Sequence, residues 1–259
     1  MLFRDWTVIG MVHLQALPGS ALWGGSMQRV VDEAVADALA LAEGGVDAIM
    51  VENYGDVPFR KDEVEPATVA SMTLAIGEIR RAVSLPLGVN VLRNDARSAL
   101  AIAAVVEASM IRVNVHVGAM LTDQGIVEGR AAETLALRRR LGADVKILAD
   151  VAVKHARPLA EFPIEESAAD AVERGLADAL IVTGSRTGAS VDLDRLRRVR
   201  ASVAVPVLAG SGVTDETITA IRDACDGAIV GSWLKTDGVV SAPVDVERVH
   251  RLMGLVRDV

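Results

Sequence analysis

Short apolar runs alternate along the chain with longer segments in which apolar residues recur every three or four positions. Short apolar runs are typical of buried strands, whereas a spacing of three and four is typical of an amphipathic helix. Residues 30–45, VVDEAVADALALAEGG, show the helical spacing. We expect eight strands over residues 7–12, 47–52, 87–91, 110–115, 145–151, 179–183, 205–210 and 227–231, and helices over residues 27–43, 66–83, 95–107, 129–141, 164–174, 192–201, 215–224 and 244–256.

This order of elements predicts a fold of the α/β class. Strands that alternate with helices form a parallel sheet, and eight such units in about 250 residues are the size of a (β/α)8 TIM barrel. A doubly wound open sheet is the competing arrangement, but it usually has fewer strands and a glycine-rich turn after its first strand. Here the first strand leads into HLQALPGS, and the glycine-rich turns come late. No long linker divides the chain, so we expect a single TIM-barrel domain over residues 1–259.

Composition and charge restrict the partners. The chain is 51% hydrophobic but only 3% aromatic, so the core must be built from Ala, Val, Leu and Ile. The net charge is -8 and no basic stripe is present, which argues against nucleic-acid binding. No apolar run approaches the roughly 18 residues of a membrane helix, and the N-terminal residues lack a signal-peptide arrangement. We therefore expect a cytoplasmic protein without membrane insertion. The sequence is compatible with a homo-oligomer.

Several reactive side chains are interpreted as structural. The single cysteine, Cys225, cannot form an internal disulfide, which fits a reducing compartment. It lies in RDACDGAIV, where we expect it to pack at a helix end and not to act as a nucleophile. His116 is expected in the core, and the RRR run at 138–140 on a solvated helix face.

Three neighbouring strand ends carry glycine together with serine or threonine, in VTGSRTG, AGSGVT and IVGSWLK. In TIM barrels the loops after strands seven and eight often bind phosphate, because glycine lets the backbone approach the ligand and helix N-termini attract anions. We expect Thr214 to cap the next helix, and Lys235 is a candidate for an added positive charge. Ordinary glycine-rich turns are the alternative. The candidate phosphate-binding residues are Thr183, Gly184, Gly188, Gly210, Ser211, Gly212, Gly231 and Ser232.

Polar side chains end the first five predicted strands, where the active site of a TIM barrel forms. Glu52 and Asp150 are the acid–base candidates, because two carboxylates in one shielded mouth can be driven to different pKa values. Lys154 is interpreted as an oxyanion clamp or a partner that keeps Asp150 ionised, with a Schiff-base role ranked last. A salt-bridged rim is the structural alternative. The candidate catalytic residues are Glu52, Asp150, Lys154, His13, Asn90 and Asn114.

Metal and cofactor binding are not indicated by any motif. His13, Asp150 and His155 are the only residues we considered for a divalent metal, and they lack the HxH or HExxH spacing that would support one. We therefore assign no metal ligand and identify no cofactor.

Eight segments, taken in chain order, resemble one family. They are MVHLQALPGS, GGVDAIMVENYGDVPF, LGVNVLRNDARSALAIA, IRVNVHVGAMLTDQGIVEG, LGADVKILADVAVKHARPL, DALIVTGSRTG, LAGSGVT and DGAIVGSWLK. The resemblance is to the BtpA/SgcQ family, and it implies a TIM-barrel-like fold, a link of some members to photosystem I biogenesis or stability, and no settled reaction. The family pattern draws attention to Glu52, Asn53, Asp56, Asn90, Arg93, Asn94, Asp95, Asp123, Asp150, Lys154 and His155. More distantly, a carboxylate followed by GDVPF is similar to the tryptophan synthase α-subunit, another phosphate-binding barrel.

Three functions follow from these residues and this resemblance. We favour an enzyme that acts on a small phosphorylated metabolite, such as a sugar phosphate, by isomerisation, epimerisation or carbon–carbon lysis. The second is a non-catalytic biogenesis or stability factor for a membrane complex such as photosystem I, although no hydrophobic or basic tract marks a partner surface. The third is a metal-dependent hydrolase or glycosyl-bond-cleaving enzyme.

Overall fold

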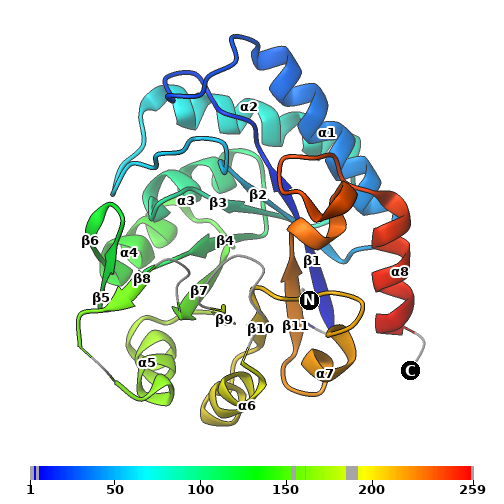
Figure 1. Ribbon diagram of the computed structural model, residues 1–259. Helices are drawn as coiled ribbons and strands as arrows, with labels where there is room; N and C mark the ends of the chain where they lie inside the picture. Colours follow the sequence, from blue (N-terminus) through cyan, green and yellow to red (C-terminus); the bar gives the residue numbers. More distant parts are fainter. Residues whose placement is uncertain (1–2, 4–5, 153–155, 161, 185–191, 258–259) are drawn as a thin grey trace.

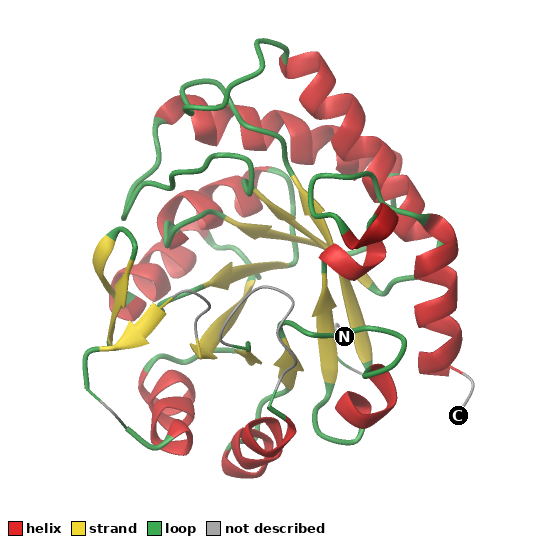
Figure 2. Ribbon diagram, viewed as in Figure 1, coloured by secondary structure: helices red, strands yellow, loops and turns green. Residues whose placement is uncertain are grey.

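The computed structural model describes the chain except for residues 1–2, 4–5, 153–155, 161, 185–191 and 258–259. Its centre is a closed barrel of eight parallel strands in the order β1-β11-β10-β9-β7-β4-β3-β2 (Figures 1 and 2). The predicted TIM barrel is therefore confirmed, and the open sheet is wrong. The barrel strands are β1 (Thr7–His13), β2 (Ala48–Glu52), β3 (Leu87–Asn90), β4 (Met110–Val113), β7 (Lys146–Ala152), β9 (Ala179–Val182), β10 (Val207–Ala209) and β11 (Gly227–Val230).

Each barrel strand is followed by a helix on the outside of the barrel (Figure 2). Within the described part of the chain, no helix is long and apolar enough to cross a membrane. Helix α5 continues as a π-helical turn over Asp170–Arg174, and two short 3-10 turns, Ser232–Leu234 and Thr236–Gly238, precede the last helix. The helices are α1 (Met27–Glu43), α2 (Pro66–Ala82), α3 (Ala96–Val105), α4 (Ala131–Leu141), α5 (Ile164–Ala169), α6 (Leu193–Ser202), α7 (Ile218–Arg222) and α8 (Val246–Arg257).

Local sequence determines where several helices begin and end. The Ser26 hydroxyl accepts a hydrogen bond from the Arg29 N–H at the start of α1, as an N-cap serine does. Before α7, the Thr214 hydroxyl accepts from the Thr217 N–H and the Thr217 hydroxyl accepts from the Thr214 N–H. Thr214 therefore stabilises the turn that leads into α7, but the N-cap residue of the helix is Thr217 and not Thr214 as expected. Helix α4 ends at Gly142, whose φ of 62° is in the left-handed region that glycine adopts without strain.

Aliphatic side chains fill both the interior of the barrel and the space between its strands and the surrounding helices, as the low aromatic content requires. Inside the barrel, Ile9, Met50 and Leu148 belong to one buried cluster. A larger buried cluster, which includes Leu41 and Ile76, lies between the strands and the helices. Strands covered on both faces are apolar along their whole length, which is why the sequence shows continuous apolar runs instead of alternation.

One small sheet was not expected from the sequence. Strands β5 (Ala119–Thr122), β6 (Gly125–Glu128) and β8 (Ala156–Pro158) form a three-stranded antiparallel sheet in the order β6-β5-β8, in segments between the expected strands and helices. The β5–β6 turn is closed by a hydrogen bond from the Thr122 hydroxyl to the Gly125 carbonyl. The strands are only three or four residues long, so their alternation is too short to stand out in a sequence.

Candidate functional site

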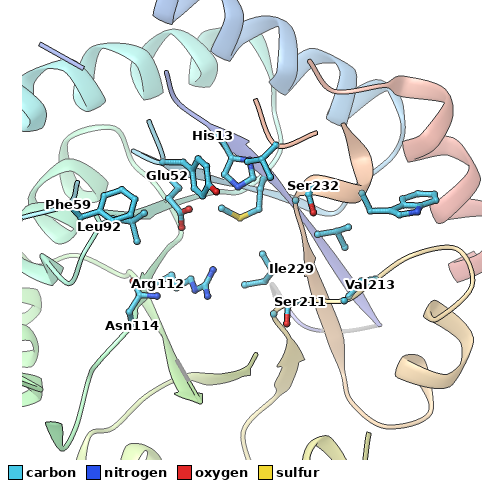
Figure 3. Close-up of a pocket in the computed structure, with 18 of the residues that line it drawn as sticks. His13, Glu52, Phe59, Leu92, Arg112, Asn114, Ser211, Val213, Ile229 and Ser232 are labelled. Carbon is cyan, nitrogen blue, oxygen red and sulfur yellow. The ribbon is translucent and has the colours of Figure 1, made fainter. Parts of the chain in front are cut away.

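A cavity of about 210 Å³ opens at the C-terminal mouth of the barrel, where the carboxyl ends of the strands meet. It is lined by His13 from β1, Glu52 from β2, Arg112 from β4, and the turns that follow β10 and β11. Figure 3 shows the Glu52 carboxylate and the Arg112 guanidinium pointing toward each other, with Ser211 and Ser232 across the cavity from them. This is the end of the barrel at which TIM-barrel enzymes carry their active sites.

Four polar side chains stand side by side at the ends of four adjacent strands. His13 pairs in register with Glu52, Glu52 with Asn90, and Asn90 with Arg112. All except His13 are buried, although charged and amide groups are costly to bury without partners. The register therefore converts four strand ends that are distant in sequence into one polar layer.

Arg112 is held by a buried carboxylate. Its Nε donates to Asp150 Oδ1 and its NH2 group to Asp150 Oδ2, both at 2.9 Å. The Asn114 amide donates to Asp150 Oδ2 at 3.0 Å, and the Asn90 amide donates to Asn114 Oδ1 at 3.3 Å. Burial alone lowers the pKa of Arg112, but the attraction and hydrogen bonds of Asp150, together with the negative charge of Glu52, outweigh burial and raise that pKa above its ordinary value. The guanidinium is thus a fixed positive charge in the mouth.

The surroundings of Asp150 do not fit the acid–base role expected for it. Its side chain is 0% exposed, and both carboxylate oxygens are bonded by Arg112 and Asn114. It does not line the cavity, whereas Glu52, Arg112 and Asn114 do. A β-bulge interrupts the register with β9 between Asp150 and Ala152, a feature that is common next to active sites.

Glu52 shares its part of the cavity with Tyr54. Burial, together with the negative charge of Glu52, raises the pKa of the Tyr54 hydroxyl, so the phenol stays protonated at neutral pH. The Tyr54 ring packs against His13 with ring centroids 4.9 Å apart. Glu52 also contributes to the raised pKa of Arg112, which agrees with the facing side chains in Figure 3.

The glycine turns line the other side of the cavity. Gly210, Ser211, Gly212 and Val213 follow β10, and Gly231 and Ser232 follow β11. Gly212 has a φ of 68°, which disfavours any residue with a side chain. In the described part of the chain, no hydrogen bond is donated by the backbone N–H groups of Ser211, Gly212 or Val213.

The loop after β9, the third of the glycine-containing loops, contacts the turn after β10 at Ser211. The Ser211 hydroxyl accepts a hydrogen bond of 2.6 Å from the Gly184 N–H. A Cβ at Gly210 would lie 2.5 Å from the Thr183 methyl group, so only glycine fits above Thr183. Thr183 and Gly184 therefore support the β10 turn and do not themselves line the cavity. Gly188, like Lys154 and His155, lies outside the described residues.

Lys235 does not supply the added charge suggested by the sequence. The side chain is buried, and its Nζ donates to Asp37 Oδ2 on α1, while Asp37 Oδ1 accepts from the Val244 N–H. The expectation was wrong because the 3-10 turn Ser232–Leu234 is followed by a side chain that is buried against Asp37 of α1 and does not line the cavity.

Two other expectations outside the site agree with the structure. Cys225 is buried, and burial raises the pKa of its thiol to about 11, so it is not a nucleophile at neutral pH. His116 is buried and donates its Nε2–H to the Gly175 carbonyl at 2.8 Å, and burial lowers its pKa. Among the residues with described positions, no group of three or more His, Cys, Asp or Glu side chains is arranged to hold a metal ion.

Sequence reasoning did not include several cavity residues among its candidates. Arg112 stands at a strand end beside Asn114, and its position could have suggested it. Phe59 and Leu92 lie in loops that carry no periodic pattern, so no signal in the sequence marks them.

The model of the BtpA family matches residues 4–258. A Synechocystis protein named photosystem I biogenesis protein BtpA is 49% identical over 243 residues, covering 93% of this chain and 85% of that protein. The putative sgc region protein SgcQ of Escherichia coli is 34% identical over 256 residues, covering 97% and 94%.

Solved structures share the fold at low identity. A thiamine phosphate pyrophosphorylase from Pyrococcus furiosus has a TM-score of 0.61 and 16% identity, covering 99% of this chain and 98% of that one. A tryptophan synthase from M. tuberculosis has a TM-score of 0.63 and 18% identity, covering 98% and 94%. The family match extends over nearly the whole sequence, and we conclude that the chain belongs to the BtpA family.

Proposed function

We propose that this protein is an enzyme that acts on a small phosphorylated metabolite by acid–base chemistry at the mouth of its barrel. One observation carries the proposal. On one side of a single cavity lie glycine turns in which the N–H groups of Ser211, Gly212 and Val213 donate no hydrogen bond to any described residue, and on the other side a carboxylate faces a fixed guanidinium. The names of two solved structures with this fold, a thiamine phosphate pyrophosphorylase and a phosphoribosyl anthranilate isomerase, agree with a phosphorylated ligand.

In this proposal the phosphate binds at the turns after β10 and β11. The N–H groups of Gly212 and Val213 and the hydroxyls of Ser211 and Ser232 donate to its oxygens. Backbone N–H groups that converge in a turn form an anion site without a charged side chain. The Ser211 hydroxyl accepts from Gly184, so its own proton is available to a ligand oxygen.

Glu52 is the proposed proton acceptor and donor. Glu52 lines the cavity and is buried. Arg112 is the proposed stabiliser of negative charge that develops on a substrate oxygen, as a preorganised cation in a shielded site does. Proton abstraction next to a carbonyl, with the enolate oxygen held by Arg112, serves isomerisation or epimerisation. In carbon–carbon lysis the base removes the proton of a β-hydroxyl group instead, and the bond that breaks leaves its electron pair on an enolate that Arg112 holds in the same way.

Asp150 then acts as a positioning residue and not as the second acid–base group. Its two bonds to Arg112 fix the plane of the guanidinium, and Asn114 fixes the carboxylate in turn. His13 and Asn90 complete the polar layer, and Lys154 keeps its proposed role as an oxyanion clamp.

Binding of inorganic phosphate and glycerol 3-phosphate, followed by thermal shift and calorimetry, tests the anion site. Gly212→Ala should abolish this binding, because a methyl group would enter the turn at a φ of 68°. Gly118→Ala is the matched control, since Gly118 also has a φ of 68° but lies before β5 with open space around it. Equal phosphate affinity in the two variants would contradict the anion site.

The acid–base role of Glu52 is tested by solvent deuterium exchange into a bound phosphate ester. Glu52→Gln should slow exchange by about 10²–10⁴-fold and leave phosphate affinity nearly unchanged. Glu173→Gln, at an exposed position after α5, is the control. Exchange that persists in Glu52→Gln would remove Glu52 from the mechanism.

A second candidate function is a non-catalytic role in the assembly or stability of a membrane complex. The name of the Synechocystis relative, photosystem I biogenesis protein BtpA, favours this role. Cells that lack the protein distinguish the two: Glu52→Gln and Gly212→Ala should fail to replace it if it is an enzyme, and should replace it if the barrel serves only as a binding surface.

A further inference from the structure

Aromatic side chains are scarce in this protein, yet they gather at one place. The sequence has three Phe, three Trp and one Tyr. Tyr54, Phe59 and Trp233 all line the cavity at the barrel mouth. Phe3, Trp6, Trp23 and Trp233 are partly buried and pack against the core, whereas Tyr54 and Phe59 belong to neither core cluster, so core packing does not explain the position of these two rings.

Two of these rings form one side of the cavity with aliphatic neighbours. Tyr54, Val57, Phe59 and Leu92, which we call the apolar wall, come from the β2–α2 loop and the β3–α3 loop. Figure 3 shows Phe59 and Leu92 on the side of Glu52 that lies away from Ser211 and Ser232. The part of the apolar wall formed by Phe59 and Leu92 therefore lies at the opposite end of the cavity from the proposed phosphate turns, with Glu52 and Arg112 between them.

Trp233 lies at the phosphate end of the cavity, and one face of its ring is already covered by another side chain. Its ring carries the Arg248 guanidinium 4.6 Å from the ring centroid, and Arg248 Nε also donates to the Trp233 carbonyl. This cation–π contact uses one face of the ring. The apolar wall has no comparable partner over Phe59 among the described ring contacts.

The apolar wall is preformed by hydrogen bonds in the loops that carry it. Asn53 Oδ1 accepts from the Leu92 N–H at 2.7 Å, and Asn53 Nδ2 donates to Asp56 Oδ2 at 3.0 Å. Asp56 Oδ1 also accepts from the Leu17 N–H at 2.8 Å. Loops fixed in this way lose little conformational entropy when a ligand binds. Val57 nevertheless remains 45% exposed, so the wall presents apolar surface that a ligand can cover.

We infer that the ligand is a phosphate ester that also carries an aromatic ring, and that the ring lies against the apolar wall while the phosphate lies in the glycine turns. This inference rests on the proposed function, because it takes the phosphate position from it. A simple polyol phosphate would place hydroxyl groups against Val57 and Leu92, where they lose hydrogen bonds to water. An aromatic ring gains from the same surface, through burial and ring–ring contact with Phe59.

The test compares three probes by calorimetry: inorganic phosphate, glycerol 3-phosphate and 3-phenylpropyl phosphate, whose three-carbon linker lets the ring extend past Glu52 and Arg112 to the apolar wall. The 3-phenylpropyl ester should bind about tenfold more tightly than glycerol 3-phosphate, a difference of about 1.4 kcal/mol and the scale of one ring contact. Phe59→Ala should remove that preference and change glycerol 3-phosphate affinity by less than about twofold. Phe162→Ala is the matched control, because Phe162 is 65% exposed and does not line the cavity.

Each outcome separates this inference from the proposed function. Equal affinity for 3-phenylpropyl phosphate and glycerol 3-phosphate would overturn the ring site and leave the anion site standing. A preference for 3-phenylpropyl phosphate that survives Phe59→Ala would also overturn the assignment to the apolar wall. Failure of all three probes, inorganic phosphate included, would overturn the anion site and this inference with it.

Discussion

Replacing Asp150 with asparagine tests whether a buried ion pair fixes the charge of the barrel mouth. The variant keeps the size of the side chain but removes the negative charge opposite a guanidinium that is 8% exposed. Asparagine can accept from only one of the two Arg112 donors, and its amide group then faces a second donor. Breaking one partner of a buried pair costs about 3–5 kcal/mol, because the other charge stays buried without compensation.

The expected loss is measured as the free energy of unfolding in urea and as a melting temperature. For a chain of this size, about 3–5 kcal/mol corresponds to a fall of roughly 6–20 °C in Tm. Asp194→Asn is the control, because Asp194 is paired with Arg197 on the surface and its side chain is 88% exposed. Such a pair is worth about 0–1 kcal/mol. If Asp150→Asn and Asp194→Asn are equally stable, the account of Arg112 as a buried, fixed cation is refuted.

Two further predictions concern groups outside the cavity. Burial raises the pKa of the Cys225 thiol to about 11, so the unfolded chain releases this proton at lower pH than the folded protein. The free energy of unfolding should therefore fall as the pH rises from about 9 to 11. Cys225→Ala should lessen that fall by up to about 3 kcal/mol. Urea unfolding across this range measures the effect, and parallel pH profiles for the two proteins would contradict it. Lys235→Met should cost about 3 kcal/mol of stability because it leaves Asp37 buried without its cation, and it should leave inorganic phosphate affinity unchanged; reduced affinity in the folded variant would place Lys235 back at the anion site.

The fold could be predicted closely because its pattern is repeated eight times. Each barrel strand is buried on both faces and reads as an apolar run, and each helix shows one apolar face. The small sheet of β5, β6 and β8 was missed because its strands are short and because one of its two pairings, β5 with β8, joins residues more than thirty positions apart. Register between such strands depends on tertiary contacts that local spacing does not report.

The residue types of the candidate site were visible at the strand ends, but their partners were not. Glu52 and Asp150 look alike in sequence, since each follows an apolar run. What distinguishes them is Arg112, which comes from another strand and bonds both oxygens of Asp150. The direction of Lys235 likewise depends on a short turn and on Asp37, nearly two hundred residues earlier. The apolar wall could not be foreseen because its side chains lie in loops without a pattern.

The central claim is that the turn after β10 holds an oxyanion opposite Glu52. A crystal structure determined in the presence of phosphate tests it most directly. The account predicts a tetrahedral anion within about 3 Å of the Gly212 and Val213 nitrogens, with the Glu52 carboxylate across the cavity from it. An empty turn at a phosphate concentration that saturates binding in solution, or an anion held elsewhere on the barrel, would contradict the account.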